Sequence, residues 1–212
     1  DAKRCGRRLL GGEPDCEFSA RVLMDADFSV ELCGEDPVLD FPWTDASGRL
    51  AYFDLKRHPE LLEQVKEARE HPELAEFLRS VNSARSVVES AKCDVWATTE
   101  LTPEEEIFGA SHKFASYVDL VLFHPDQRQS FPEHERFAKR LAALLRRAPE
   151  MSSSAEVCVR RCFFGQGSET REGFYFTVYM NGYGSDEAAA RQNWAIGMKL
   201  VGSAIVQLAG AE

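Results

Sequence analysis

Apolar and polar side chains alternate along several stretches of the second half of the chain. In residues 173–181 one set of alternate positions is apolar, and the other carries hydroxyl and amide groups. Residues 114–123 alternate less strictly, and residues 94–101 and 155–164 are rich in strand-forming side chains. Because successive side chains of a strand point to opposite faces, this period of two predicts β-strands with one buried face. The last two strands should form a hairpin closed by a polar loop, residues 165–172.

Helical periodicity lies between and after these strands. Ser130–Glu133 spells a capping box, and residues 137–148 then carry apolar side chains three and four apart until Pro149 ends the helix. A last helix should begin at Ser185 or Asp186. Its apolar face carries Trp194, Gly197, Met198, Val201, Ile205 and Leu208, and its glycines would allow close packing.

The first half of the chain gives weaker signals. Residues 21–32 alternate and predict one or two short strands. His58–Leu61 and His71–Leu74 are near-copies with Pro in a first-turn position, so we expect a helical hairpin there. Thr102–Glu105 is a second capping box, which predicts a short helix ending near Gly109.

The element order predicts an α+β fold with an antiparallel sheet and helices packed on one face. From residue 94 onward it matches a permuted split β-α-β, ferredoxin-like arrangement. We divide the chain into a flexible lead-in (residues 1–17), a strand and helical-hairpin subdomain (18–93) and a sandwich core (94–212), and we expect the last two to form one compact unit. The strand and hairpin of residues 18–93 are expected to form a lid over the open sheet face.

The composition of the chain argues against nucleic acid and membranes as binding partners. The chain carries 35 acidic and 25 basic side chains, a formal net charge of −10, and such a field disfavours binding to nucleic acid. The apolar segments are too short to cross a membrane, and no targeting pattern is present, so we expect a globular cytoplasmic protein. No cofactor follows from the sequence.

The candidate binding residues come from the polar rows of two strands. Tyr117 and Asp119 share a face in one strand, and Tyr175, Thr177 and Tyr179 share a face in another. If both rows lie on the open side of the sheet, they converge, and Arg160 or Arg161 joins them. Such a cluster suits a small polar ligand. The alternative interpretation is a half-solvated sheet face in which Asp119 pairs with an arginine for structural reasons.

The cysteines give no catalytic signal. Cys158 and Cys162 lie four positions apart on one strand, too far from each other to bridge, and are expected to be buried thiols. A disulfide, if the protein is exported, is most expected around Cys5 and Cys16.

Metal and phosphate motifs are incomplete. His124, Asp126, His134 and Glu135 bracket one loop, but proline neighbours and a helix start are ordinary surface settings for such histidines, so we predict no metal site. The glycines of residues 181–184 are expected to make a turn and not a phosphate loop.

Three functional hypotheses follow from these patterns. The first is a small polar-molecule-binding domain, which an enzyme would also need, using the open sheet face. The second is an interaction or assembly module, including a homo-oligomer, that uses the same aromatic face. The third is a metal-dependent hydrolase, which depends on the histidine loop alone.

Overall fold

A computed structural model describes residues 24–48, 51–103, 105, 109–166 and 169–209. Its sheet is built from β1 (Asp25–Glu31), β2 (Leu39–Phe41), β3 (Val88–Thr98), β4 (His112–Leu122), β5 (Ser153–Gln166) and β6 (Glu169–Gly184). Its helices are the 3-10 helix η1 (Pro59–Gln64), α1 (Lys66–Glu70), α2 (Pro72–Val81), α3 (Pro125–Arg128), α4 (Phe131–Leu145) and α5 (Glu187–Ala209).

The described residues form one six-stranded sheet in the order β1-β5-β6-β4-β3, and β2 also pairs with β5. The four later strands pair with one another in antiparallel fashion, whereas β1 and β2 run parallel to β5. β4 and β5 are joined through α4, and β6 lies between them. This is the split β-α-β unit that the element order predicts, within the expected α+β fold.

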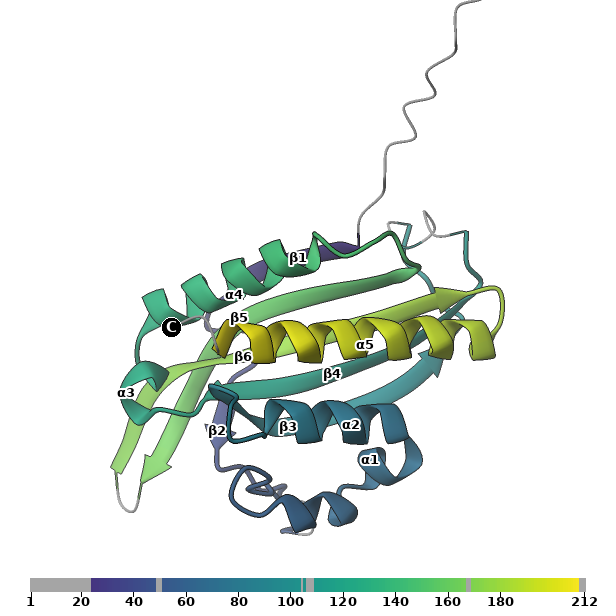
Figure 1. Cartoon of the computed structure of the whole chain (residues 1–212). Helices are drawn as coiled ribbons and strands as arrows, with labels where there is room; N and C mark the ends of the chain where they lie inside the picture. The colour runs from purple at the N-terminus through teal and green to yellow at the C-terminus, as the bar shows by residue number, and fades with distance from the viewer. Residues whose placement is uncertain (1–23, 49–50, 104, 106–108, 167–168, 210–212) are drawn as a thin grey trace, which may run out of the picture.

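The helices lie on one face of the sheet, as Figure 1 shows for α2, α4 and α5. A single large core fills the space between the layers, with Trp194 of α5 and Phe176 and Val178 of β6 all fully buried. The apolar face predicted for the last helix is buried at each of its positions. The prediction of helices on one face is therefore confirmed.

The residues expected to form a lid do not lie together. They are distributed among the sheet edge, the helical layer and the chain between β2 and η1. β1 and β2 extend the sheet at the β5 edge, and α2 joins the helical layer beside α5. The described chain between β2 and η1 wraps the β3 edge: Trp43 and Tyr52 pack against the open-face cluster, whereas Leu55 belongs to the core on the helical side. We call its described residues, 42–48 and 51–57, the strap. The boundary proposed between residues 93 and 94 falls inside β3.

Strand ends differ from the sequence prediction. The loop predicted at residues 165–172 is mostly strand, because β5 and β6 stay paired out to Gln166 and Glu169. The turn predicted at residues 181–184 is wrong for the same reason: these residues pair with β4 and β5. The first of the two near-copies, His58–Leu61, begins the 3-10 helix η1, which is followed by the short α1. The second, His71–Leu74, begins α2.

The helix starts follow the predicted caps. The Ser130 hydroxyl accepts from the Glu133 amide, and the Asp186 carboxylate accepts from the Ala189 amide. The Glu105 carboxylate accepts from the Thr102 amide, but much of the helix predicted after Thr102 lies outside the described residues. The lead-in and the Cys5 and Cys16 positions lie outside them as well.

α5 lies directly on the backbone of β6. A Cβ built on Gly182 would stand 2.1 Å from the Trp194 amide nitrogen, and one on Gly184 would stand 2.4 Å from that of Ala190. Glycine at these positions therefore sets the distance between helix and sheet. Among the described helices, α5 included, none is long and apolar enough to span a membrane.

Candidate functional site

The predicted site residues converge on the open sheet face. The strand register places Tyr117 opposite Tyr179, and Asp119 opposite Thr177. Arg160 lies opposite Tyr175 on the next strand. Directly opposed residues share a face, so this part of the sheet forms the polar row that the alternation predicts.

Arg160 and Thr177 connect this row through hydrogen bonds. One Nη atom of Arg160 donates to the Thr177 hydroxyl at 2.8 Å and to the Tyr179 hydroxyl at 3.1 Å. The Thr177 hydroxyl in turn donates to the Asp119 carboxylate at 2.7 Å. Glu31 on β1 accepts from the Arg160 Nε at 2.7 Å. Sequence reasoning missed Glu31, because nothing in the alternation of β1 shows which strand it pairs with.

Asp119 is the most strongly perturbed acid of this row. Asp119 is only 6% exposed to solvent. Burial raises its pKa from the ordinary 3.8 to about 6, against the opposing effects of the Thr177 hydrogen bond and the charges of Lys92 and Arg160. A carboxyl group with this pKa can exchange a proton near neutral pH.

Tyr175 joins the polar row to an apolar cluster, because its hydroxyl interacts with Thr177 and Arg160 while its ring is packed among apolar side chains. It is buried in a second apolar cluster with Leu39, Phe41, Val121 and the strap's Trp43. Burial, followed by the charge of Asp119, raises its pKa to about 12. Its ring therefore anchors the strap side of the sheet.

Cys158 also lies on the open face, beside the row. Its thiol is 2.8 Å from the Ser29 hydroxyl and 3.6 Å from a Glu156 carboxylate oxygen. Burial raises its pKa to about 12, which opposes thiolate formation. Cys158 and Cys162 are both buried free thiols, as predicted.

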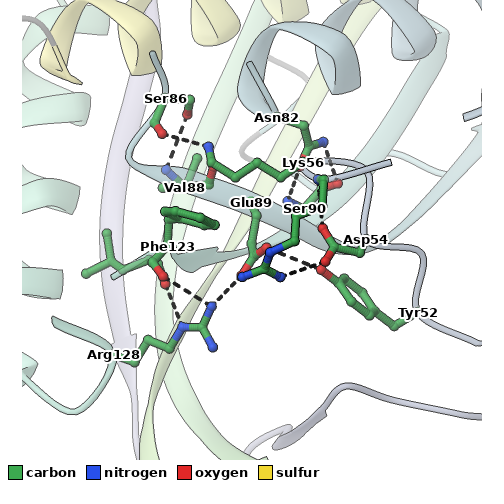
Figure 2. A network of polar contacts seen from close by, with 12 residues as sticks. Tyr52, Asp54, Lys56, Asn82, Ser86, Val88, Glu89, Ser90, Phe123 and Arg128 are labelled. Atoms are coloured by element: carbon green, nitrogen blue, oxygen red, sulfur yellow. Dashed lines mark hydrogen bonds and ion pairs between the residues drawn. The ribbon is translucent and has the colours of Figure 1, made fainter. Parts of the chain in front are cut away.

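The strap is held to the sheet by a second polar network, drawn in Figure 2. Glu89 on β3 is only 1% exposed, accepts from the Tyr52 hydroxyl at 3.2 Å and pairs with Arg128. Burial raises the Glu89 pKa despite the opposing charge of Arg128. Arg128 also lies over the rings of Phe41 and Phe164.

Lys56 fastens the strap to the start of β3. Its ammonium group donates to the carbonyls of Ser83, Ser86 and Val88 at 2.7–3.1 Å. Sequence reasoning missed this network, although a charged residue inside the apolar run around Glu89 signals a buried partner.

A groove of about 620 Å³ lies between β3, the strap and the η1–α1 segment. For comparison, the groove between α2 and α5 has about 360 Å³. The wall from the strap and helices is largely apolar, with Trp43, Phe53, Leu55, Val65 and Leu78. Charged and hydroxyl groups also line it, namely Lys66 and Glu67 of α1, and Lys92, Asp94 and Tyr117 of the sheet.

Two side chains link the groove to the predicted polar row. Tyr117 lines the groove and also faces Tyr179, with ring centroids 6.3 Å apart. Lys92 lines the groove and lies directly opposite Asp119 in the register. Of the six predicted residues only Tyr117 lines this groove, and the others lie in the sheet face behind it.

The histidine loop does not gather around a common point. His134 is completely buried against the rings of Phe174 and Phe176, and its Nδ1 is 2.9 Å from the Ser130 carbonyl oxygen. The surface setting predicted for it is therefore wrong. Within the described residues no three His, Cys, Asp or Glu side chains are placed to hold a metal ion.

Comparison of the chain with models of protein families, with curated proteins and with solved structures found no match.

Proposed function

We propose that this chain is a binding domain for an amphipathic organic ligand, and that the ligand occupies the groove between β3 and the strap. The groove volume of about 620 Å³ is the observation that carries the proposal. Sites for small molecules commonly enclose about 300–1,000 Å³. The combination of apolar lining residues with a few charged and hydroxyl groups is also typical of such sites.

The lining determines which ligand chemistry is favoured. An apolar part would contact Phe53, Leu55 and Val65. An ionic or hydrogen-bonding part would reach Lys92 and Asp94 at the opposite wall. The polar row adjoins this wall, because Lys92 lies directly opposite Asp119 in the strand register.

Binding of small-molecule fragments, monitored by two-dimensional NMR, tests the proposal. We expect small amphipathic fragments carrying a carboxylate or an amine to shift the amide signals of Lys92 and Asp94 and the indole signal of Trp43. Gln64, an exposed residue of the groove wall, offers a blocking variant, since Gln64→Trp places a large ring in the cavity.

The matched control is Gln207→Trp, which places the same ring on an exposed position of α5 away from the groove. The shifts should disappear in Gln64→Trp and persist in Gln207→Trp. Fragment shifts that survive the Gln64 substitution would contradict the proposal.

A second candidate function is assembly through the aromatic side of the sheet. Trp96 on β3 is 38% exposed and stands 6.4 Å from the ring of Tyr117, which in turn faces Tyr179. Exposed aromatic residues of this kind are enriched at interfaces. Light scattering at micromolar concentration tests it: a dimer that Trp96→Lys converts to a monomer would support assembly, and a monomeric wild-type protein would exclude it at that concentration.

A further inference from the structure

β3 is an edge strand, and side chains cover only its first half. The Lys56 ammonium group donates to the Val88 carbonyl, and the Trp43 indole donates to the Ala91 carbonyl at 2.6 Å. The side-chain oxygen of Asn82 accepts from the Ser90 amide at 2.9 Å. The Ser86 hydroxyl also accepts from the Val88 amide. Four backbone groups between Val88 and Ala91 are thus already bonded, which blocks the pairing of a further strand there.

The second half of β3 is different because of a β-bulge. The Phe123 amide donates to the Val87 carbonyl, so residues 87 and 89 face β4 and residues 88 and 90 face outward. The register shifts between Ser90 and Lys92. From Lys92 onward the even-numbered residues therefore pair with β4, and the amide and carbonyl groups of Cys93, Val95 and Ala97 point away from the sheet.

Within the described part of the chain, Cys93 presents both of its outer backbone groups without a side-chain cap. The next outer amide, that of Val95, is bound by the neighbouring Asp94 carboxylate at 2.8 Å. The groove runs along this edge, since Ser90 to Asp94 form its wall on the sheet side. The amide group of Cys93, a hydrogen-bond donor, and its carbonyl group, an acceptor, therefore both face the groove.

We infer that the groove binds an extended peptide segment of a partner protein, which adds to the Lys92–Thr98 half of β3 as a further strand. This inference rests on the proposed function and specifies its ligand. Main-chain hydrogen bonds to Cys93 supply the anchor, and the two walls of the groove supply side-chain selectivity.

The two walls predict the pattern of the peptide. Side chains of an added strand alternate between the two sheet faces. On the helical side they meet Val65 and Leu78, and on the open side they meet Trp43, Lys92 and Tyr117. The peptide should therefore alternate apolar residues with charged or aromatic ones.

The walls also distinguish a peptide from a second copy of this chain. Trp43 and Lys56 already occupy the edge before Lys92. The strap and α1 stand beside the groove, so a single extended segment fits more readily than the edge of another complete sheet. Self-pairing is nevertheless a defined outcome of the experiment below.

The experiment selects binders from a display library of random linear nine-residue peptides against the full chain. We expect enriched sequences with a period of two, whose affinity falls by about tenfold or more in Cys93→Pro, which removes one outward amide. Cys93→Ser is the matched control, because it changes the side chain and keeps the amide. Equal peptide affinity for Cys93→Pro and wild-type protein would overturn the inference.

A second measurement avoids any change to the protein. Single N-methylation at successive positions of a selected peptide should weaken binding at every second residue, since alternate amides of an added strand face β3. Losses without this period would overturn strand addition. Light scattering completes the set: a wild-type dimer that Cys93→Pro dissociates would replace the peptide with a second copy.

Failure of this inference differs from failure of the proposed function. If fragments bind in the groove and are blocked by Gln64→Trp, but the library gives no peptide, only the peptide is wrong. If neither fragments nor peptides bind there, both proposals fail together.

Discussion

Thr177 is the residue through which the charges of the open face are connected. Its hydroxyl accepts from Arg160 and donates to Asp119, and the residue is only 1% exposed. A neutral hydroxyl thus separates a buried cation from a buried acid. Both charged groups would lose a hydrogen bond if this hydroxyl were removed.

Thr177→Val tests this role because valine has nearly the same shape without the hydroxyl. We expect the free energy of unfolding to fall by about 1–3 kcal/mol, the usual cost of leaving buried polar groups without a partner. Thr177→Ser keeps the hydroxyl and should lose less. Urea denaturation measures both, and a larger loss in Thr177→Ser than in Thr177→Val would show that packing of the methyl group, not the hydroxyl, is what matters.

Asp119 should make stability depend on pH. Because its pKa is raised from 3.8 to about 6 in the folded protein, the fold binds this proton more tightly than the unfolded chain does. Its stabilising effect is present below about pH 4 and is lost as the pH rises through about 6.

The measurement is the free energy of unfolding of wild type relative to Asp119→Asn across this range. We expect the difference to shift against the wild type by on the order of 2–3 kcal/mol between about pH 4 and 6. A carboxyl carbon signal of Asp119 that titrates near 4 in NMR would contradict the raised pKa.

At the scale of the elements, the position of α5 depends on glycines in β6. Gly182→Ala is expected to cost about 1–3 kcal/mol or more, since the new methyl group would overlap the α5 backbone at Trp194. Gly165→Ala in β5 is the control, because there the nearest atom is 4.0 Å away. Thermal unfolding of the two variants should differ clearly, and similar melting temperatures would show that α5 can move away without loss.

The same elements show what the sequence could predict. Local sequence patterns predicted the alternation in β4 and β6 and the periodic face of α5. They also predicted that these elements form two layers. Local pattern also favoured a turn at Gly182, where the glycine instead admits a helix backbone. Pairings between distant segments, such as Glu31 with Arg160, depend on a parallel register that no local signal carries.

The groove could not be predicted from local sequence patterns for a related reason. Its walls come from the strap, η1, α1, α2 and β3, and each contributes ordinary residues whose importance arises only from their assembly. Tyr117 was predicted because it belongs to an alternating row. Lys92 and Cys93 were not, because the bulge in β3 changes which of its residues face outward.

At the scale of the whole molecule, the strap is joined to the sheet through the hydrogen bond from Tyr52 to Glu89, and Arg128 of α3 is the ion-pair partner of Glu89. Arg128→Met leaves the Glu89 carboxylate, 1% exposed, without its cation. We expect a loss of roughly 3 kcal/mol and faster hydrogen exchange in the strap. Glu89→Gln combined with Arg128→Met removes the unpaired charge and should recover part of the loss; unchanged exchange in the strap would contradict this role.

The position of β6 has a consequence for how the protein is made. β6 follows the other strands in the chain, yet it lies between β4 and β5. While a ribosome has delivered only the residues up to β5, the nascent polypeptide holds two sheet fragments that share no strand. Each fragment exposes an unpaired edge, and α5 has not yet arrived to cover the apolar face. Synthesis of β6 therefore joins the two halves, and until then the emerging chain exposes strand edges and apolar surface, the features that favour misassociation during folding.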